Sequence, residues 1–238
     1  MPGPQVPWGI FIGRSGSTSK MRIFPTNFYQ LLPRQITSSI IFHGKRECRN
    51  LFLTFDDGPH GICTPAILES LKELKIQASF FVLGENAVRF PEIIKQIQMG
   101  EHTIGIHGDT HQSFLFLKSA SIREQIEKTQ KHLENLLGKE ISFFRPPYGL
   151  FGWNTFRIVR QQGLRIVLWD ILPGDYKLNR TASAMIDQVL IQIRGGSIIV
   201  FHDNQANPDK LIKSLIQIHK QAILEGYRFV SLEELTND

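Results

Sequence analysis

Residues 51–59 read LFLTFDDGP, a short apolar run that ends in two aspartates and a Gly-Pro pair. An uninterrupted apolar run of this length is typical of a strand buried on both faces of a parallel sheet. The Gly-Pro pair turns the chain, and a helical face of isoleucine and leucine follows over residues 67–74. This unit of strand, turn and helix predicts one step of an α/β fold.

The same unit recurs along the rest of the chain. Seven strands are predicted, at 51–55, 78–84, 102–107, 141–144, 164–169, 197–202 and 227–232. Helices are predicted between them, at 65–74, 91–99, 122–137, 151–162, 181–193 and 211–224. Thr64 is the expected N-cap of the first helix, and Ser121 with Glu124 is the expected capping box of the third. The alternation indicates one domain over residues 50–238 with parallel strands.

The composition is that of an ordinary globular protein of 238 residues, 42% hydrophobic and 21% charged, a length that suits one (β/α) barrel. The net charge is +5, but the densest basic cluster, at 45–49, is short and interrupted by Glu47. A nucleic-acid binder therefore ranks lowest. The two cysteines exclude a Cys-rich zinc module. No apolar run approaches the roughly 20 residues of a transmembrane helix, so no transmembrane segment is predicted.

The first 49 residues are predicted to be an N-terminal extension of unknown role. Residues 1–20 are rich in glycine, serine and proline and are predicted to be loose, and Met21 is the more natural-looking start. No signal peptide is recognisable, because the apolar stretch at 8–12 is too short and has no basic lead.

Polar side chains gather where the predicted strands end. They are Asp56, Asp57, His107, Arg145, Asp170, Asp175 and His202. The carboxyl ends of parallel strands form one face of the fold, where active sites are built. Because five strands contribute, a closed or nearly closed barrel fits this pattern better than an open sheet with one switch point.

One pair of histidines near these strand ends has the spacing of a metal site. His107 and His111 are four residues apart, which on a helical turn places both imidazoles on one side. This pair alone is a weak signal, since the chain has eight histidines. With Asp57 it makes three ligands and leaves a position for water, as in hydrolytic metal sites. The alternative for the adjacent aspartates is a turn with a capping side chain.

Two further motifs supply an arginine and a third histidine. Arg145 precedes two prolines, and such a stiff loop fixes the guanidinium and aims a backbone N–H at the reaction centre; the alternative is a surface turn. His202 ends an apolar strand and is the expected general acid, with Asp175 as the carboxylate that tunes its pKa. The alternative is a core histidine bonded to a carbonyl.

Together these residues resemble the polysaccharide deacetylase family (carbohydrate esterase family 4, the NodB homology domain). The family's TFDDGP motif is complete at 54–59, and its RPPYG motif is complete at 145–149. The other three motifs match at His107 and His111, at 175–176 and at 200–202. The resemblance covers about residues 50–232 and implies a distorted (β/α) barrel of about seven parallel strands.

The resemblance also implies metal-dependent removal of acetyl groups from an N-acetylated glycan. By motif position, the metal ligands are Asp57, His107 and His111. The ion is expected to be Zn²⁺, with Co²⁺, Mn²⁺ or Ni²⁺ as alternatives. The catalytic groups are Asp56 as base, Arg145 as its orienting partner, His202 as acid and Asp175 as the partner of that acid.

The remaining implied roles concern the pocket. Tyr148 supplies a backbone N–H to the oxyanion, and Tyr176 and Val200 line the pocket for the acetyl methyl group. These last two residues replace the tryptophan and leucine of the family pattern, which reshapes the pocket wall. Gly108 replaces a hydroxyl residue between the metal histidines, which removes a loop hydrogen bond.

The leading hypothesis is a deacetylase of N-acetylglucosamine units in peptidoglycan or chitin-like oligomers. One alternative is a hydrolase of a small amide, such as a formamide or cyclic imide, on the same barrel. Another is a non-catalytic glycan-binding module, whose signature is loss of a metal ligand or of the base. A glycan substrate indicates the cell envelope, whereas the lack of a recognisable signal peptide indicates the cytoplasm, so the compartment stays open. The oligomeric state stays open as well.

Overall fold

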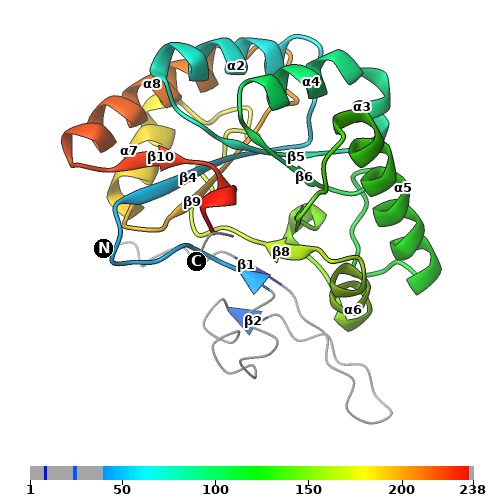
Figure 1. The fold of residues 1–238 in the computed structure, drawn as a ribbon. Coiled ribbons are helices and arrows are strands. Elements are labelled where there is room, and N and C mark those ends of the chain that lie inside the picture. The colour runs from blue at the N-terminus through cyan, green and yellow to red at the C-terminus, as the bar shows by residue number, and fades with distance from the viewer. Residues whose placement is uncertain (1–7, 10–23, 26–39, 236–238) are drawn as a thin grey trace.

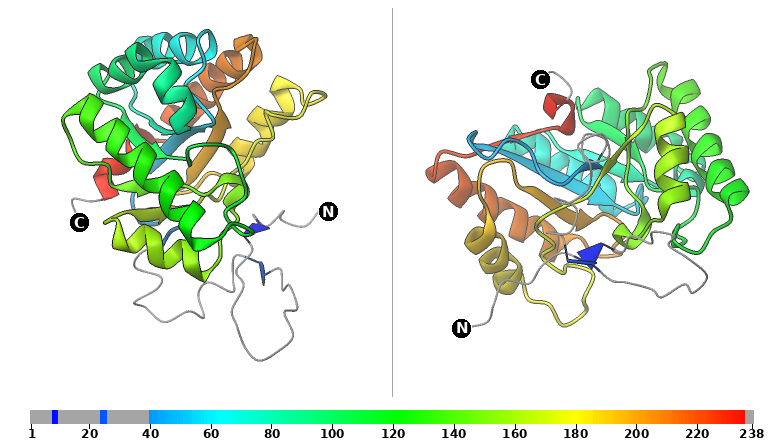
Figure 2. Two further views of the ribbon diagram at one scale, coloured as in Figure 1. Left: turned by 90° about the vertical axis from the view of Figure 1, so that its right-hand side faces the viewer. Right: turned by 90° about the horizontal axis from the view of Figure 1, so that it is seen from below.

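The computed structural model describes residues 8–9, 24–25 and 40–235, and its main body is one curved sheet with helices along its outside (Figures 1 and 2). Within the described residues this sheet has eight strands, and all of their pairings are parallel. The strands are β3 (Ile40–Ile41), β4 (Asn50–Asp56), β5 (Ser79–Val82), β6 (Thr103–Ile106), β7 (Phe143–Phe144), β8 (Arg165–Val167), β9 (Ile198–His202) and β10 (Arg228–Val230).

Strand β4 lies at the centre of the sheet. It pairs with β9 on one side, and on the other the order continues through β5, β6, β7 and β8 to β3. Beyond β8 the chain returns to β9 through a parallel bridge between Ile171 and Ile199. The Asp170 carboxylate accepts the Ile198 N–H there at 2.8 Å. These contacts curl the sheet back on itself, and the predicted distorted barrel is confirmed, with β3 as an additional strand.

The helices lie close to their predicted positions. Those described are α2 (Cys63–Leu74), α3 (Gly84–Arg89), α4 (Pro91–Met99), α5 (Ser119–Leu137), α6 (Trp153–Gln161), α7 (Ala182–Gln192) and α8 (Asp209–Leu224). Figure 1 shows α2, α4 and α8 along one side of the sheet and α5 and α6 along another. The short α3 was not predicted, because its six residues carry no apolar period.

Two predicted helix starts are wrong. Helix α2 begins at Cys63, so Thr64 lies inside it, and His60 Nδ1 accepts the Cys63 N–H at 3.2 Å in place of a threonine cap. Helix α5 begins at Ser119, so Ser121 is not its N-cap. The Ile122 N–H already bonds to the Lys118 carbonyl at 3.0 Å, and this earlier turn displaces the predicted capping box.

Alternate residues of β4 face two different apolar clusters, as the period of a strand requires. Leu51, Leu53 and Phe55 belong to the larger cluster, which also holds buried helix residues. Phe52 faces a smaller cluster with Phe81, Phe143, Val167, Ile198 and Leu232, which come from other strands and the C-terminal segment. Thr54 and Asp56 continue the Phe52 face toward the carboxyl end of the strand. This face therefore changes from apolar to polar at the end where the site lies.

Residues 40–49 pack with the sheet. Beside β3, the Gly44 N–H donates to the Gly196 carbonyl at 2.8 Å, and Arg46 donates to the Asp170 carboxylate at 2.7 Å. Further toward the N-terminus, β1 (Trp8–Gly9) pairs antiparallel with β2 (Phe24–Pro25). The predictions of a loose tail and of a start at Met21 otherwise fall on residues outside the described ranges.

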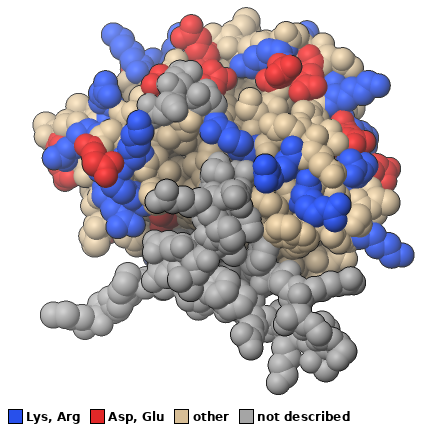
Figure 3. All heavy atoms as spheres, turned by 60° about the horizontal axis from the view of Figure 1, so that its bottom comes forward, with Lys and Arg blue, Asp and Glu red and all other residues tan. Residues whose placement is uncertain are grey.

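Figure 3 shows that the Lys and Arg side chains on the visible face form separate groups with Asp and Glu among them. They do not form a continuous basic stripe on that face, the feature that nucleic-acid binding favours. Among the residues described, no helix has the length and apolar character needed to cross a membrane.

Candidate active site

The inward face of β4 ends at Asp56, whose carboxylate is bound by a buried arginine. Arg145 follows β7 and donates from Nη1 to Asp56 Oδ1 at 2.6 Å and to Thr54 Oγ1 at 2.8 Å. Its remaining nitrogens donate to the carbonyls of Val167 at 3.2 Å and Leu168 at 3.3 Å. Because the guanidinium fork is planar, these four acceptors fix both its position and that of the Asp56 carboxylate.

Arg145 is fully buried within the barrel. Its guanidinium carbon lies 4.0 Å from the centre of the Phe81 ring, a cation–π distance. Burial lowers the pKa of the guanidinium, and the charge and hydrogen bond of Asp56 oppose that shift. A buried charge of this kind is stable only when it is paired and hydrogen-bonded, and here Asp56 pairs with the guanidinium while four acceptors bind it in all.

The next residue, Asp57, points elsewhere. Its φ of +77° is in the left-handed region, which few residues other than glycine adopt, and this turns its side chain away from the direction of Asp56. Asp57 Oδ1 lies 3.1 Å from His111 Nε2 and 3.4 Å from His107 Nε2. The three predicted ligand residues therefore converge, with one ligand atom of each within 4.8 Å of the others.

The hydrogen bonding of these residues fits a bound cation. The His107 Nδ1 atom lies 2.7 Å from the Arg145 carbonyl, which can only accept, so Nδ1 carries the proton and donates it. In a neutral His107, Nε2 then faces Asp57 Oδ1 as one acceptor facing another. Asp57 Oδ1 is buried and has no hydrogen-bond partner among the described residues. A cation between these atoms would satisfy both of them.

The distances and the electrostatics agree with that fit. Ligand atoms that share one ion at about 2.0–2.2 Å lie roughly 3–3.5 Å apart, and Asp57 Oδ1 lies at such a separation from the Nε2 atoms of both histidines. Burial acts to raise the pKa of Asp57, but His107 and His111 outweigh it, so the pKa lies well below its usual range. Asp57 is therefore ionised and ready to bind a cation at neutral pH.

The loop that carries the two histidines is a bend, so the predicted helical turn at 107–111 is wrong. Gly108 has a φ of +106°, which a helical turn excludes and which a side chain would strain. Two neighbouring residues anchor the loop: Lys128 donates to the Asp109 carboxylate at 2.6 Å, and the Thr110 N–H donates to Gln125 Oε1 at 3.2 Å. The glycine that departs from the family pattern thus allows this loop conformation.

The predicted partner of His202 lies beside it. Asp175 Oδ1 is 3.0 Å from His202 Nδ1, and Asp175 Oδ2 accepts the His202 backbone N–H at 2.7 Å. Burial acts to lower the pKa of His202, but the hydrogen bond and charge of Asp175 raise it to about 9. His202 pairs in register with Asp56, so the two side chains leave neighbouring strands at the same level.

The other predicted residues lie around these groups. Tyr148 has a φ of +61° in the loop after Arg145, and its ring meets the His111 ring edge-on with centres 4.6 Å apart. Tyr176 is half exposed and lies edge-on to His202 with centres 5.3 Å apart. Val200 is buried two residues before His202 on the same face of β9. All three therefore lie near the titratable groups.

Sequence reasoning missed three polar residues that hold this site. Asn204 donates to Asp57 Oδ2 at 3.0 Å, and Asn86 donates to the Asp57 carbonyl at 2.9 Å. Gln205 donates to Asp175 Oδ2 at 3.1 Å. Two of these amides come two and three residues after His202, but polar residues after a strand are ordinary in loops, so no signal distinguished them.

Two histidines and one aspartate outside the predicted site are structural. His102 is buried and accepts the Ala78 N–H at 3.2 Å, and burial lowers its pKa to about 4. His60 serves the start of α2, and Asp170 serves the closure of the sheet.

Comparison with known proteins places the chain in a family. A sequence model described as polysaccharide deacetylase matches residues 43–167. The chain belongs to the polysaccharide deacetylase family. This confirms the predicted resemblance, and the matched residues include the two aspartates, both histidines of the bend and the arginine motif.

Individual relatives have related names, and a solved one has the same fold. The chain is 36% identical over 199 residues to a peptidoglycan-N-acetylglucosamine deacetylase of Bacillus cereus, a match that covers 82% of this chain and 70% of the relative. It is 34% identical to a chitooligosaccharide deacetylase of Azorhizobium caulinodans, over 76% of this chain and 86% of the relative. A solved peptidoglycan N-acetylglucosamine deacetylase superposes with a TM-score of 0.81 at 34% identity, over 84% of this chain and 94% of that one.

Proposed function

We propose that this protein is a metal-dependent hydrolase that removes N-acetyl groups from N-acetylglucosamine units of peptidoglycan or chitin-like glycans. The family and the names of the relatives support this class of reaction. The observation that carries the proposal is the division of labour between two adjacent aspartates. Asp56 is held by a buried arginine, whereas Asp57 lies between two histidines.

Asp57, His107 and His111 would hold the ion. Two histidines and a carboxylate suit Zn²⁺ best, and Co²⁺, Mn²⁺ and Ni²⁺ accept the same donors. A divalent ion bound there supplies Lewis acidity, which polarises the acetamide carbonyl and acidifies water. Asn204 supports the arrangement by holding the second oxygen of Asp57, as groups that contact metal ligands commonly do.

Asp56 is the proposed general base. Its Oδ1 atom is fixed by the Arg145 guanidinium, so the carboxylate has one orientation and needs no reorganisation when it takes a proton. Arg145 is a positioning residue in this scheme, because burial within the barrel keeps it from the substrate.

His202 is the proposed general acid. Asp175 lies against its Nδ1 atom, which leaves Nε2 as the end that can give a proton to the departing amine. A pKa of about 9 keeps the imidazole protonated at neutral pH, as an acid in this step requires. The Tyr148 N–H is the proposed oxyanion donor, and Tyr176 and Val200 are the proposed walls of the methyl pocket.

Acetate release from two glycans tests the proposal. Purified protein is incubated with chitooligosaccharide and with peptidoglycan, each with and without a chelator. We expect acetate release that chelator abolishes and added Zn²⁺ restores. Release that chelator does not affect would contradict a metal-dependent mechanism. Release from small amides but from neither glycan would favour the alternative small-amide hydrolase, and binding without release would favour a non-catalytic module.

The variant Asp56→Asn tests the base. It should lose turnover and keep its metal, because Asn is similar in shape and Asp56 is not a proposed ligand. Substantial residual turnover would remove Asp56 from this role. Because peptidoglycan lies in the cell envelope, that is the compartment we propose for the substrate.

A further inference from the structure

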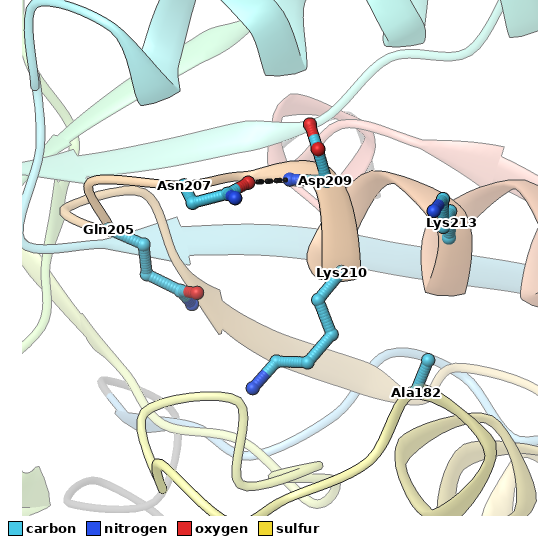
Figure 4. A pocket seen from close by; sticks show the side chains of 6 residues that line it. All are labelled: Ala182, Gln205, Asn207, Asp209, Lys210 and Lys213. Carbon is cyan, nitrogen blue, oxygen red and sulfur yellow. Dashed lines mark hydrogen bonds between the residues drawn. The ribbon is translucent and has the colours of Figure 1, made fainter.

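An open cavity of about 440 Å³ lies beside the proposed acid and has no part in the chemistry described above (Figure 4). It lies between the start of α8, the loop after β9 and the start of α7. The residues that line it are Ala182, Gln205, Asn207, Asp209, Lys210 and Lys213. Most of these residues are polar, two lysines and one aspartate among them, although the surface that they present to the cavity is more apolar than polar.

One wall of the cavity touches the proposed catalytic pair. Gln205 lines the cavity and donates to Asp175 Oδ2 at 3.1 Å, and Asp175 Oδ1 lies 3.0 Å from His202 Nδ1. The cavity is thus connected to the acid through Gln205 and Asp175. A polymeric glycan with one sugar at His202 would present a neighbouring sugar, or a substituent of that sugar, to this wall.

The charge of the cavity is positive on the side that a ligand would meet. Lys210 and Lys213 are one helical turn apart on α8 and both line the cavity. Figure 4 shows the Lys210 ammonium reaching into the cavity, whereas the Asp209 carboxylate leaves the helix on the opposite side. Lys210 is half-buried, and neither lysine forms an ion pair with another residue in the described part of the chain. A half-buried lysine without a partner favours a ligand of opposite charge.

A neutral donor adds to the two charges. The Asn207 Oδ1 atom accepts the Asp209 N–H at 2.9 Å, so the amide nitrogen of Asn207 is the end that can donate to a ligand. Two ammonium groups and an amide N–H match a carboxylate, which only accepts hydrogen bonds when it is ionised.

We propose that this cavity is a subsite for a carboxylate carried by the glycan next to the sugar that loses its acetyl group. The inference rests on the proposed function and narrows its substrate class to anionic glycans. Peptidoglycan meets the requirement, because its muramic sugars bear a lactyl carboxyl group that is either free or extended by a peptide with carboxylates of its own. Chitin-like oligomers carry no such group, so the cavity gives them no ionic contact.

The test compares three substrates and two lysine variants. The substrates are a neutral chitooligosaccharide, a peptide-free peptidoglycan strand with its lactyl carboxylates, and the same strand with its peptides. For Lys210→Gln and Lys213→Gln, we expect kcat/KM on the anionic strands to fall about fivefold for each variant, the effect of losing one charged hydrogen bond. On chitooligosaccharide both variants should match the unmodified protein.

Two controls separate this subsite from general effects. Lys95→Gln removes a lysine on α4 that already pairs with Glu92, so it should leave all three substrates unchanged. Raising the salt concentration should weaken the preference for anionic strands in the unmodified protein and much less in the double lysine variant. A larger loss on the peptide-free strand assigns the subsite to the lactyl carboxylate, and a larger loss on the peptide-bearing strand assigns it to the peptide.

Equal losses on neutral and anionic strands, or no loss on either, would overturn the subsite. Failure of the proposed function is a separate outcome, because it would show as no acetate release from any glycan by the unmodified protein. In that case the subsite is tested by calorimetric titration of the same strands into Asp56→Asn protein. Tighter binding of the anionic strands that disappears in the lysine double variant would support it, and equal affinities would overturn it.

Discussion

The arginine side and the histidine side of this site begin at adjacent residues, yet they are held in different ways. On the arginine side, the Asp56 carboxylate and the Arg145 guanidinium are buried and satisfy each other. On the histidine side, Asp57 Oδ1 is buried and finds no hydrogen-bond partner in the part of the chain that the structure describes, and the His111 side chain is 32% exposed. The first arrangement is complete within the chain, whereas the second needs a cation to complete it.

This difference separates what the fold needs from what the reaction needs. A buried ion pair stabilises the barrel only while both partners are present, because a single buried charge has no water to solvate it. The Asp57 carboxylate already interacts with His107, His111 and Asn204, and a cation bound there would stabilise the folded state further. Substitutions on the arginine side should therefore lower stability more than metal affinity. Substitutions on the histidine side should lower metal affinity more than stability.

Arg145→Met gives the largest expected effect. It leaves Asp56 buried without its partner, so the free energy of unfolding should fall by about 3–5 kcal/mol, and turnover should be lost with it. Urea unfolding monitored by circular dichroism measures the first effect. Arg46→Met is the matched control, since it removes an arginine–aspartate pair that is only partly buried. A stability loss no greater than that of the control would show that the buried pair on the arginine side supports the fold no more than a partly buried pair does.

Asp57→Asn should have the opposite pattern. It removes a charged ligand, so the affinity for Zn²⁺ should fall by at least about 100-fold, which is roughly 2.7 kcal/mol. The metal-free protein should lose much less stability than Arg145→Met does, because the substitution leaves no fully buried charge without its partner. Calorimetric zinc titration and urea unfolding in chelator measure the two quantities. A large loss of stability in chelator would show that Asp57 supports the fold as Asp56 does.

Asp175→Asn tests the proposed general acid, His202, by removing its carboxylate partner. Without the carboxylate, the pKa of His202 should fall from about 9 toward the ordinary histidine value of 6.5, and the alkaline limb of the kcat/KM profile should move to lower pH. An unmoved limb would mean that another group titrates there.

The same pKa has a consequence for stability. Because the folded pKa of about 9 lies above the unfolded value of 6.5, protonated His202 contributes stability that is full below pH 6.5. This contribution is lost as the pH rises through about 9, and Asp175→Asn should reduce it. Urea unfolding of the metal-free protein at pH 6 and at pH 10 measures the change.

Much of this arrangement could be predicted from the sequence, because apolar runs and strand ends are local signals. The runs at β4 and β9 were predicted to within a residue, and their polar ends located Asp56 and His202. The histidine spacing was recognised, but Gly108 turns the loop into a bend rather than a helical turn. Helix α3 has no periodic signal, and its start depends on a hydrogen bond from the Gly84 N–H to the Gly108 carbonyl at 2.9 Å.

The residues that hold the site were beyond such reasoning. Asn204 and Asp57 are 147 positions apart, and only the pairing of β9 with β4 brings them together. An asparagine after a strand has many ordinary uses in loops, so its type carries no information about a partner so distant. Contacts of this kind are set by tertiary structure, and they decide how firmly a ligand is held.

Asn204→Ala gives the smallest expected effect, and it separates metal affinity from stability most clearly. The loss of its 3.0 Å bond to Asp57 Oδ2 leaves all three ligands in place but frees the carboxylate to rotate. Zinc affinity should fall about tenfold, at the low end for groups that support a metal ligand, while stability in chelator stays close to that of Asn154→Ala, an exposed control on α6. Unchanged affinity would mean that the three ligands hold the ion without support from Asn204. A tenfold loss of affinity without a loss of stability would show that Asn204 serves the bound cation and not the fold. The histidine side would then be organised by its cation, as the arginine side is organised by the buried charge of Arg145.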